Sequence, residues 1–140
     1  MIRVEIRGKE FPLCLTVAAL DQINSKCGGI GKINDFLFPK KPAASEEEST
    51  SLDLYARAKN LAWLLGLLIQ EGEENRIVEG QFAGSRPERR AVPGPEEVMH
   101  LLKLGEALQY GTVVTNAIND SLWQDIEATH SKNADHAEQG

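Results

Sequence analysis

Two Glu-x-x-His pairs are the residues of this chain whose types and spacing come closest to a metal-binding pattern. They are Glu97 with His100 and Glu127 with His130. In helical bundles, two such pairs and two further glutamates hold a di-iron site when all of the side chains point into the bundle. The pairs therefore have to be judged by the helix faces on which they fall.

Helix phase argues against a metal site. The apolar residues that define the buried face of the first helix are Val98, Leu101 and Leu102. Glu97 and His100 lie off that face, and Glu127 lies beside the apolar stripe of the last helix. We also expect no glutamate on the apolar stripe of the central helix. The pairs are then solvated neighbours on a helix surface, and we expect no metal, no cofactor and no catalytic residue.

Other catalytic patterns are incomplete. The segment Gly28–Lys32 does not meet the phosphate-loop pattern GxxxxGK[ST], and we interpret it as a helix stop and a turn. Cys14 and Cys27 form no CxxC motif, so we expect two small buried side chains in a reducing compartment. Of the three histidines, His130 and His136 lie at or in a polar tail.

A basic cluster and two tryptophans are further candidates for contacts with a partner. Arg86, Arg89 and Arg90 share one loop, where they either contact an acidic partner or phosphate or remain solvated. Trp63 and Trp123 are expected to be core or interface anchors, since aromatic residues are frequent in both places.

Length and charge limit the possible functions. A chain of 140 residues suits one domain, which we place at residues 1–130, followed by a polar, disordered tail at 131–140. The net charge of -6 disfavours a general nucleic-acid binder. The charge is uneven, with a net +3 over residues 1–41 and a net -9 over residues 42–140.

The longest apolar run, Leu61–Ile69, is too short to span a membrane, and the first residues do not resemble a signal peptide, so we expect a cytoplasmic protein.

The N-terminal pattern predicts a β-hairpin followed by two short helices. Apolar and polar residues alternate over 1–15, with the turn expected at Gly8-Lys9 and an edge strand containing Pro12. Thr16 is expected to cap a helix that reaches about residue 26, with Val17 and Ile23 on its apolar face. A second helix is expected over about 32–38, and a polar, mobile loop over 40–50.

The sequence pattern of residues 52–129 predicts a mainly helical fold. A buried central helix is expected from Leu52 to about Glu71, then a break at 72–76, a short helix near 77–82 and a loop at 83–93. Pro95 is expected to open the next helix, and one long helix is expected over 105–129. We therefore predict a hairpin packed on a bundle of about four to six helices, with a central apolar helix and a long C-terminal helix.

The order of these segments resembles a known family. A hairpin with Ile6-Arg7-Gly8-Lys9-Glu10-Phe11 leads into a helix, then a hydrophobic helix with an acidic end (Leu61–Glu74), and finally a helix that ends in Asn119-Asp120-Ser121-Leu122. This resembles the tail assembly chaperones of long-tailed bacteriophages and prophages, over roughly residues 1–130.

The resemblance implies a binding protein that has no active site. Such chaperones coat the aggregation-prone tape measure protein, contact tail tube subunits in the cytoplasm of the host bacterium, and are absent from the mature virion. Many relatives also have a longer, frameshifted form, and a homo-oligomer is possible. The implied partners do not include nucleic acid or membrane.

A holdase needs exposed apolar surface, and the sequence suggests three regions for it: the edge strand, the loop at 30–38 and one face of the last helix. Together with the basic loop, the candidate partner-binding residues are Phe11, Leu13, Phe36, Phe38, Arg86, Arg89, Arg90, Tyr110, Val113 and Val114. Two alternatives stay open: another phage tail structural or completion protein, and a small helical enzyme using His100 with Glu97 or a cysteine.

Overall fold

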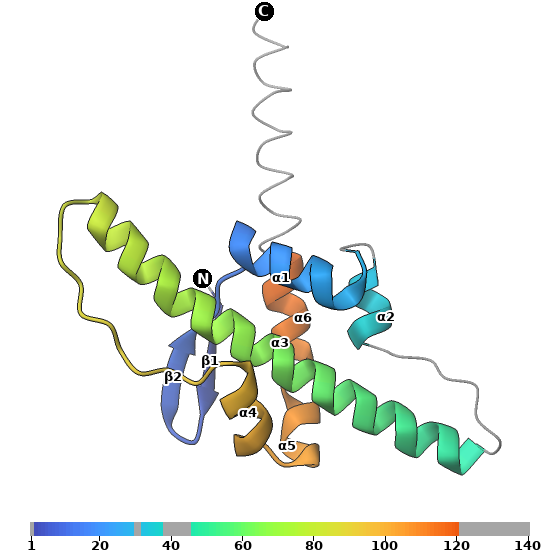
Figure 1. Cartoon of the computed structure of the whole chain (residues 1–140). Helices are drawn as coiled ribbons and strands as arrows, with labels where there is room; N and C mark the ends of the chain where they lie inside the picture. Colours follow the sequence, from blue (N-terminus) through green and yellow to red (C-terminus); the bar gives the residue numbers. More distant parts are fainter. Residues whose placement is uncertain (1, 30–31, 38–45, 121–140) are drawn as a thin grey trace, which may run out of the picture.

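The computed structural model describes residues 2–29, 32–37 and 46–120, and shows a mainly helical fold led by a β-hairpin (Figure 1). Its elements, in chain order, are β1 (Arg3–Ile6), β2 (Lys9–Pro12), α1 (Val17–Cys27), α2 (Ile33–Leu37), α3 (Glu46–Phe82), α4 (Pro95–Leu101), α5 (Leu104–Gln109) and α6 (Gly111–Asn119). The predicted fold class is confirmed. The predicted segment after residue 120 and most of the predicted polar loop lie outside the described residues.

The hairpin closes one residue earlier than the sequence pattern predicts. Arg7 and Gly8 both have positive φ, at 50° and 81°, and form the turn. Two positive φ values in succession are the geometry of the tight type I′ turn, whose twist matches the strands. Lys9 is therefore the first residue of β2 and pairs with Ile6. The predicted turn at Gly8-Lys9 is wrong because Arg7, a non-glycine residue, accepts the left-handed conformation.

Helix α1 begins and ends where its capping residues predict. The Thr16 hydroxyl accepts a hydrogen bond from the Ala19 N–H at 3.0 Å, and Gly28 ends the helix with φ 79°. The predicted apolar face is only half right. Ile23 is buried together with Ala19, whereas Val17 is 85% exposed, because the face that meets the core runs through positions 19 and 23.

Helix α3 is the centre of the fold, and the other elements pack around it (Figure 1). The buried residues Leu64, Leu65, Leu67, Leu68 and Ile69 are at most 1% exposed. Such a close run covers more than half of the circumference of a helix, and the side that is left carries the half-buried Trp63 and the exposed Gln70. The prediction of a buried central helix is confirmed. Each fully buried leucine contributes about 1.5–3 kcal/mol to stability.

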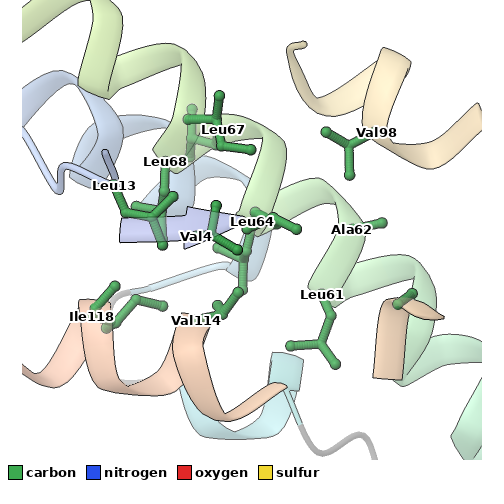
Figure 2. Packing of buried hydrophobic residues seen from close by; sticks show 14 of the residues in the cluster. Val4, Leu13, Leu61, Ala62, Leu64, Leu67, Leu68, Val98, Val114 and Ile118 are labelled. Carbon is green, nitrogen blue, oxygen red and sulfur yellow. The ribbon is translucent and has the colours of Figure 1, made fainter. Parts of the chain in front are cut away.

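The core joins α3 to both ends of the described chain. Figure 2 shows Leu64, Leu67 and Leu68 between hairpin residues, helix α4 and helix α6. The core residues that these neighbours supply are Val4, Leu13, Val98, Val114 and Ile118. The hairpin thus lies on a helix, as expected for a two-stranded sheet that is marginal alone.

The predicted break at residues 72–76 is wrong, because α3 continues through Gly72 to Phe82. Glycine serves there as a packing notch: a Cβ at position 72 would come closer than 3.0 Å to the Pro12 carbonyl oxygen. Gly66 similarly accommodates the backbone of Gly94 and Pro95 at the start of α4. These glycines allow neighbouring backbones to touch the helix.

The predicted long C-terminal helix is divided at Tyr110, where the backbone leaves helical geometry with φ -87° and ψ 2°. The Tyr110 hydroxyl donates to the Glu5 carbonyl of β1 at 3.2 Å. Gly111 then starts α6 against Arg57 and Leu61 of α3. The turn aligns α6 so that Val114, expected on an open face of the last helix, is buried, whereas the apolar Leu104 is 52% exposed.

The notch at Gly72 gives a direct test. We expect Gly72→Ala to lower the free energy of unfolding by about 1–3 kcal/mol, since the added methyl group overpacks a rigid backbone contact. Gly105→Ala is the matched control, because a Cβ there meets nothing within 4 Å. It is expected to leave stability unchanged or to raise it by up to about 1 kcal/mol. Urea unfolding measures both, and equal effects at the two positions would contradict the notch.

Candidate functional site

The predicted partner-binding residues do not form one surface. Leu13 and Val114 are 3% and 0% exposed and belong to the core, so neither is available for direct contact in this fold. Their burial corrects the expectation that they lie on open faces of a strand and a helix. Both faces that looked unpartnered in the sequence meet α3.

The other apolar candidates are partly covered. Phe11, Phe36, Tyr110 and Val113 are half-buried against the core. Phe36 packs edge-to-face on Trp63, with ring centroids 5.9 Å apart, and the Lys26 ammonium lies 5.4 Å from the Trp63 centroid. Phe38 and Trp123 lie outside the described residues. A partner role for these side chains stays a prediction.

The arginine loop is tied to the acidic part of α3. Arg89 forms an ion pair with Glu74, and the Arg90 backbone N–H donates to Glu73. Arg86 is exposed. Two of the three residues therefore help to hold the loop between α3 and α4, a role that the sequence reasoning missed.

Two glutamates of α3 are buried, which the sequence reasoning did not anticipate. Glu71 is 8% exposed and accepts a hydrogen bond from the Thr16 hydroxyl at 2.9 Å. Glu73 is 6% exposed and accepts two hydrogen bonds from Arg76, at 2.9 and 2.8 Å. Their burial is possible because each carboxylate has a polar partner. The i, i+3 spacing of Glu73 and Arg76 was the sequence signal for this pair.

The partners of Glu73 lower the pKa of its carboxyl to about 2. The Arg76 hydrogen bond is the largest cause, and the Arg90 N–H and the charges of both arginines act in the same direction, while burial opposes them. The carboxylate is thus a fixed negative charge that holds α3, the returning loop and Arg76 together. It does not have the properties of a proton donor near neutral pH.

The Glu-x-x-His pair that the structure describes is on the surface. Glu97 and His100 are both exposed on α4, and Glu97 accepts a hydrogen bond from the Gly94 N–H at 3.2 Å. The second pair lies outside the described residues. Within residues 2–29, 32–37 and 46–120, no three His, Cys, Asp or Glu side chains are arranged to hold a metal ion. Cys14 and Cys27 are half-buried, and burial raises the pKa of the Cys27 thiol.

An open apolar groove lies between the first half of α3, α4 and α5. Its volume is about 380 Å³, and it is lined by Tyr55, Ala58, Lys59, Ala62, Met99, Leu102, Leu104 and Ala107. Tyr55 is 61% exposed, Leu104 52% and Met99 40%. Large apolar side chains gathered at one exposed place commonly mark an interaction surface. We call these eight residues the α3–α5 groove.

A second exposed apolar feature lies at the end of α3. Val78 and Phe82, one helical turn apart, are 58% and 95% exposed. Both side chains therefore project from the last turns of α3 into solvent. The sequence pattern identified neither feature, since exposure of these side chains depends on how α4 and α5 cross α3.

Comparison with protein-family models, with curated proteins and with solved structures finds no match for this chain. No helix among the described residues has the length and apolar character needed to cross a membrane.

The Glu73 cluster predicts a pH-dependent stability. We expect Glu73→Gln to lower the free energy of unfolding by about 1–3 kcal/mol at neutral pH, because Arg76 and the Arg90 N–H lose their charged partner. The native pKa of about 2 lies below the ordinary value of 4.5. The stabilisation is therefore complete above about pH 4.5 and is lost as the pH falls toward 2.

Urea unfolding between pH 3 and pH 7 checks this, with the exposed Glu79→Gln as control. The stabilities of the wild type and Glu73→Gln should converge toward acid, while Glu79→Gln should follow the wild type throughout. A constant difference between wild type and Glu73→Gln over the whole range would show that the carboxylate charge is not responsible.

Proposed function

We propose that this protein is a tail assembly chaperone of a long-tailed bacteriophage or prophage, which binds the tape measure protein and tail tube subunits and performs no catalysis. It acts in the cytoplasm of the host bacterium and does not remain in the mature virion. The observation that carries the proposal is an exposed apolar groove on a fold whose segment order resembles that family.

The segment order supports the proposal through the described elements. A hairpin (β1 and β2) leads into a short capped helix, then into the long apolar helix α3 with its acidic stretch, and finally into short helices that pack back on it. The resemblance was drawn from an order that closes with one long helix, in place of which the described residues form α5 and α6. Apolar residues of the hairpin, α1, α3 and α6 belong to the core of the fold.

The surface supports the proposal through its chemistry. Eight large apolar side chains of the described residues are at least 36% exposed, and three of them line the α3–α5 groove. A protein that holds an aggregation-prone helical client needs such surface, since helix recognition uses an apolar groove for the apolar face of the client.

Co-expression tests the proposal. The cognate tape measure protein is produced alone, with this protein, or with an unrelated acidic protein of similar size, and its soluble fraction is measured. We expect most of it to be soluble only with this protein, and the two to co-purify. Insolubility in all three cases would contradict the chaperone function, and finding this chain as a stoichiometric component of purified virions would favour a structural protein instead.

A further inference from the structure

We propose that the α3–α5 groove is the client-binding surface, and that it takes an amphipathic helix with carboxylates beside its apolar stripe. The inference rests on the proposed function. It names the surface that binds the client and the kind of client segment that this surface accepts.

The floor of the groove allows close approach of a helix. Ala58 and Ala62 lie one turn apart on α3, and Ala107 of α5 faces the same hollow. Small side chains at a helix contact shorten the distance between helix axes. A client helix can therefore place larger apolar side chains, at the i, i+4 and i+7 positions of its stripe, into the space above the alanines.

The walls of the groove are apolar and adaptable. Tyr55 stands on the α3 side, and Met99 and Leu104 stand on the α4 and α5 side. All three are at least 40% exposed, so binding would remove apolar area from water at each of them. The flexible thioether of Met99 suits a surface that must fit varying side chains. The walls thus favour a helix chosen for its apolar stripe more than for one fixed sequence.

Charge selects among amphipathic helices. The three other hollows described in this chain each contain at least two glutamates in their linings. The α3–α5 groove contains no carboxylate, and Lys59 is part of its lining. Lys103, also exposed, lies between the groove residues Leu102 and Leu104. In a chain of net charge -6, this local positive rim is complementary to acidic residues that flank the stripe of a client helix.

The same charge argument disfavours a basic client helix, which would bring lysine or arginine against Lys59 and Lys103. Like charges brought together at an interface weaken the wrong complex, and oppositely charged groups set the orientation of the right one. The groove therefore predicts a preference that can be measured with peptides differing only in the sign of their flanking charges.

Two synthetic amphipathic helices of about 18 residues serve as probes, with the same leucine stripe and either glutamates or lysines beside it. Binding to the full-length protein is measured by fluorescence anisotropy. We expect the glutamate peptide to bind at least about tenfold more tightly, a difference of about 1.4 kcal/mol. Added salt should reduce this preference, because the rim charges are exposed.

Variants locate the site. Leu104→Ser and Tyr55→Ser should each weaken binding of both peptides about tenfold, and Lys59→Glu should remove or reverse the preference for the acidic peptide. Phe82→Ser is the matched control, because Phe82 is 95% exposed and lies at the other end of α3. It should change the affinity less than about twofold. Circular dichroism and urea unfolding confirm that each variant is folded.

Three results would overturn the inference. They are equal affinity for the two peptides, equal weakening by Phe82→Ser and the groove variants, and a concentration-dependent oligomer in sedimentation that the groove variants abolish. The last would assign the groove to a second copy of the chain.

The co-expression assay separates this inference from the proposed function. If the groove variants still keep the tape measure protein soluble, the groove is not the client site, although the chaperone function stands. If the wild type fails to keep it soluble, the proposed function is wrong. The peptide measurements then still show whether the groove binds an acidic amphipathic helix.

Discussion

Close backbone contact with α3 is the constraint on which the rest of the structure depends. At Gly66 and Gly72 the absence of a side chain lets the start of α4 and the end of β2 touch the helix directly. Glycine within a helix costs about 0.5–1 kcal/mol relative to alanine. The contacts offset this cost, because they bring the hairpin and α4 near enough to bury the leucines between them.

Polar contacts then fix the segments that the apolar core brings together. Glu71 accepts a hydrogen bond from the Thr16 hydroxyl, which also caps α1. Glu73 accepts hydrogen bonds from the Arg76 side chain and from the Arg90 N–H in the loop after α3. The Arg7 side chain, at the tip of the hairpin, donates to the Leu101 carbonyl and to Glu106. The contacts of Thr16 with Glu71, of the Arg90 N–H with Glu73, and of Arg7 with Leu101 and Glu106 each join segments distant in sequence. The acidic stretch of α3 is therefore part of the scaffold, whereas Lys59 and Lys103 beside the α3–α5 groove are exposed.

Local signals predicted the local structure well. Thr16, Gly28 and Pro95 marked helix ends correctly, because capping depends on the residue and its immediate neighbours. Errors arose where tertiary contacts decided the outcome. Gly72 was predicted to break a helix because the sequence does not show the approach of Pro12. The bend at Tyr110 accompanies its hydrogen bond to β1 and the contact of the next residue, Gly111, with α3. The groove was missed for the same reason, since its exposed residues come from three elements whose crossing no periodicity in the sequence determines.

The contact between Pro12 and Gly72 also has a consequence for folding during synthesis. Sixty residues separate these partners, and the Thr16–Glu71 hydrogen bond spans 55. Contacts of such separation must close a long loop before they stabilise anything, which slows folding. At about 5–20 residues per second, the ribosome takes several seconds to extend the chain from the hairpin to α3. The hairpin and α1 are therefore synthesised before the part of α3 that supplies their core, and the ribosome delays the contacts on which their packing depends.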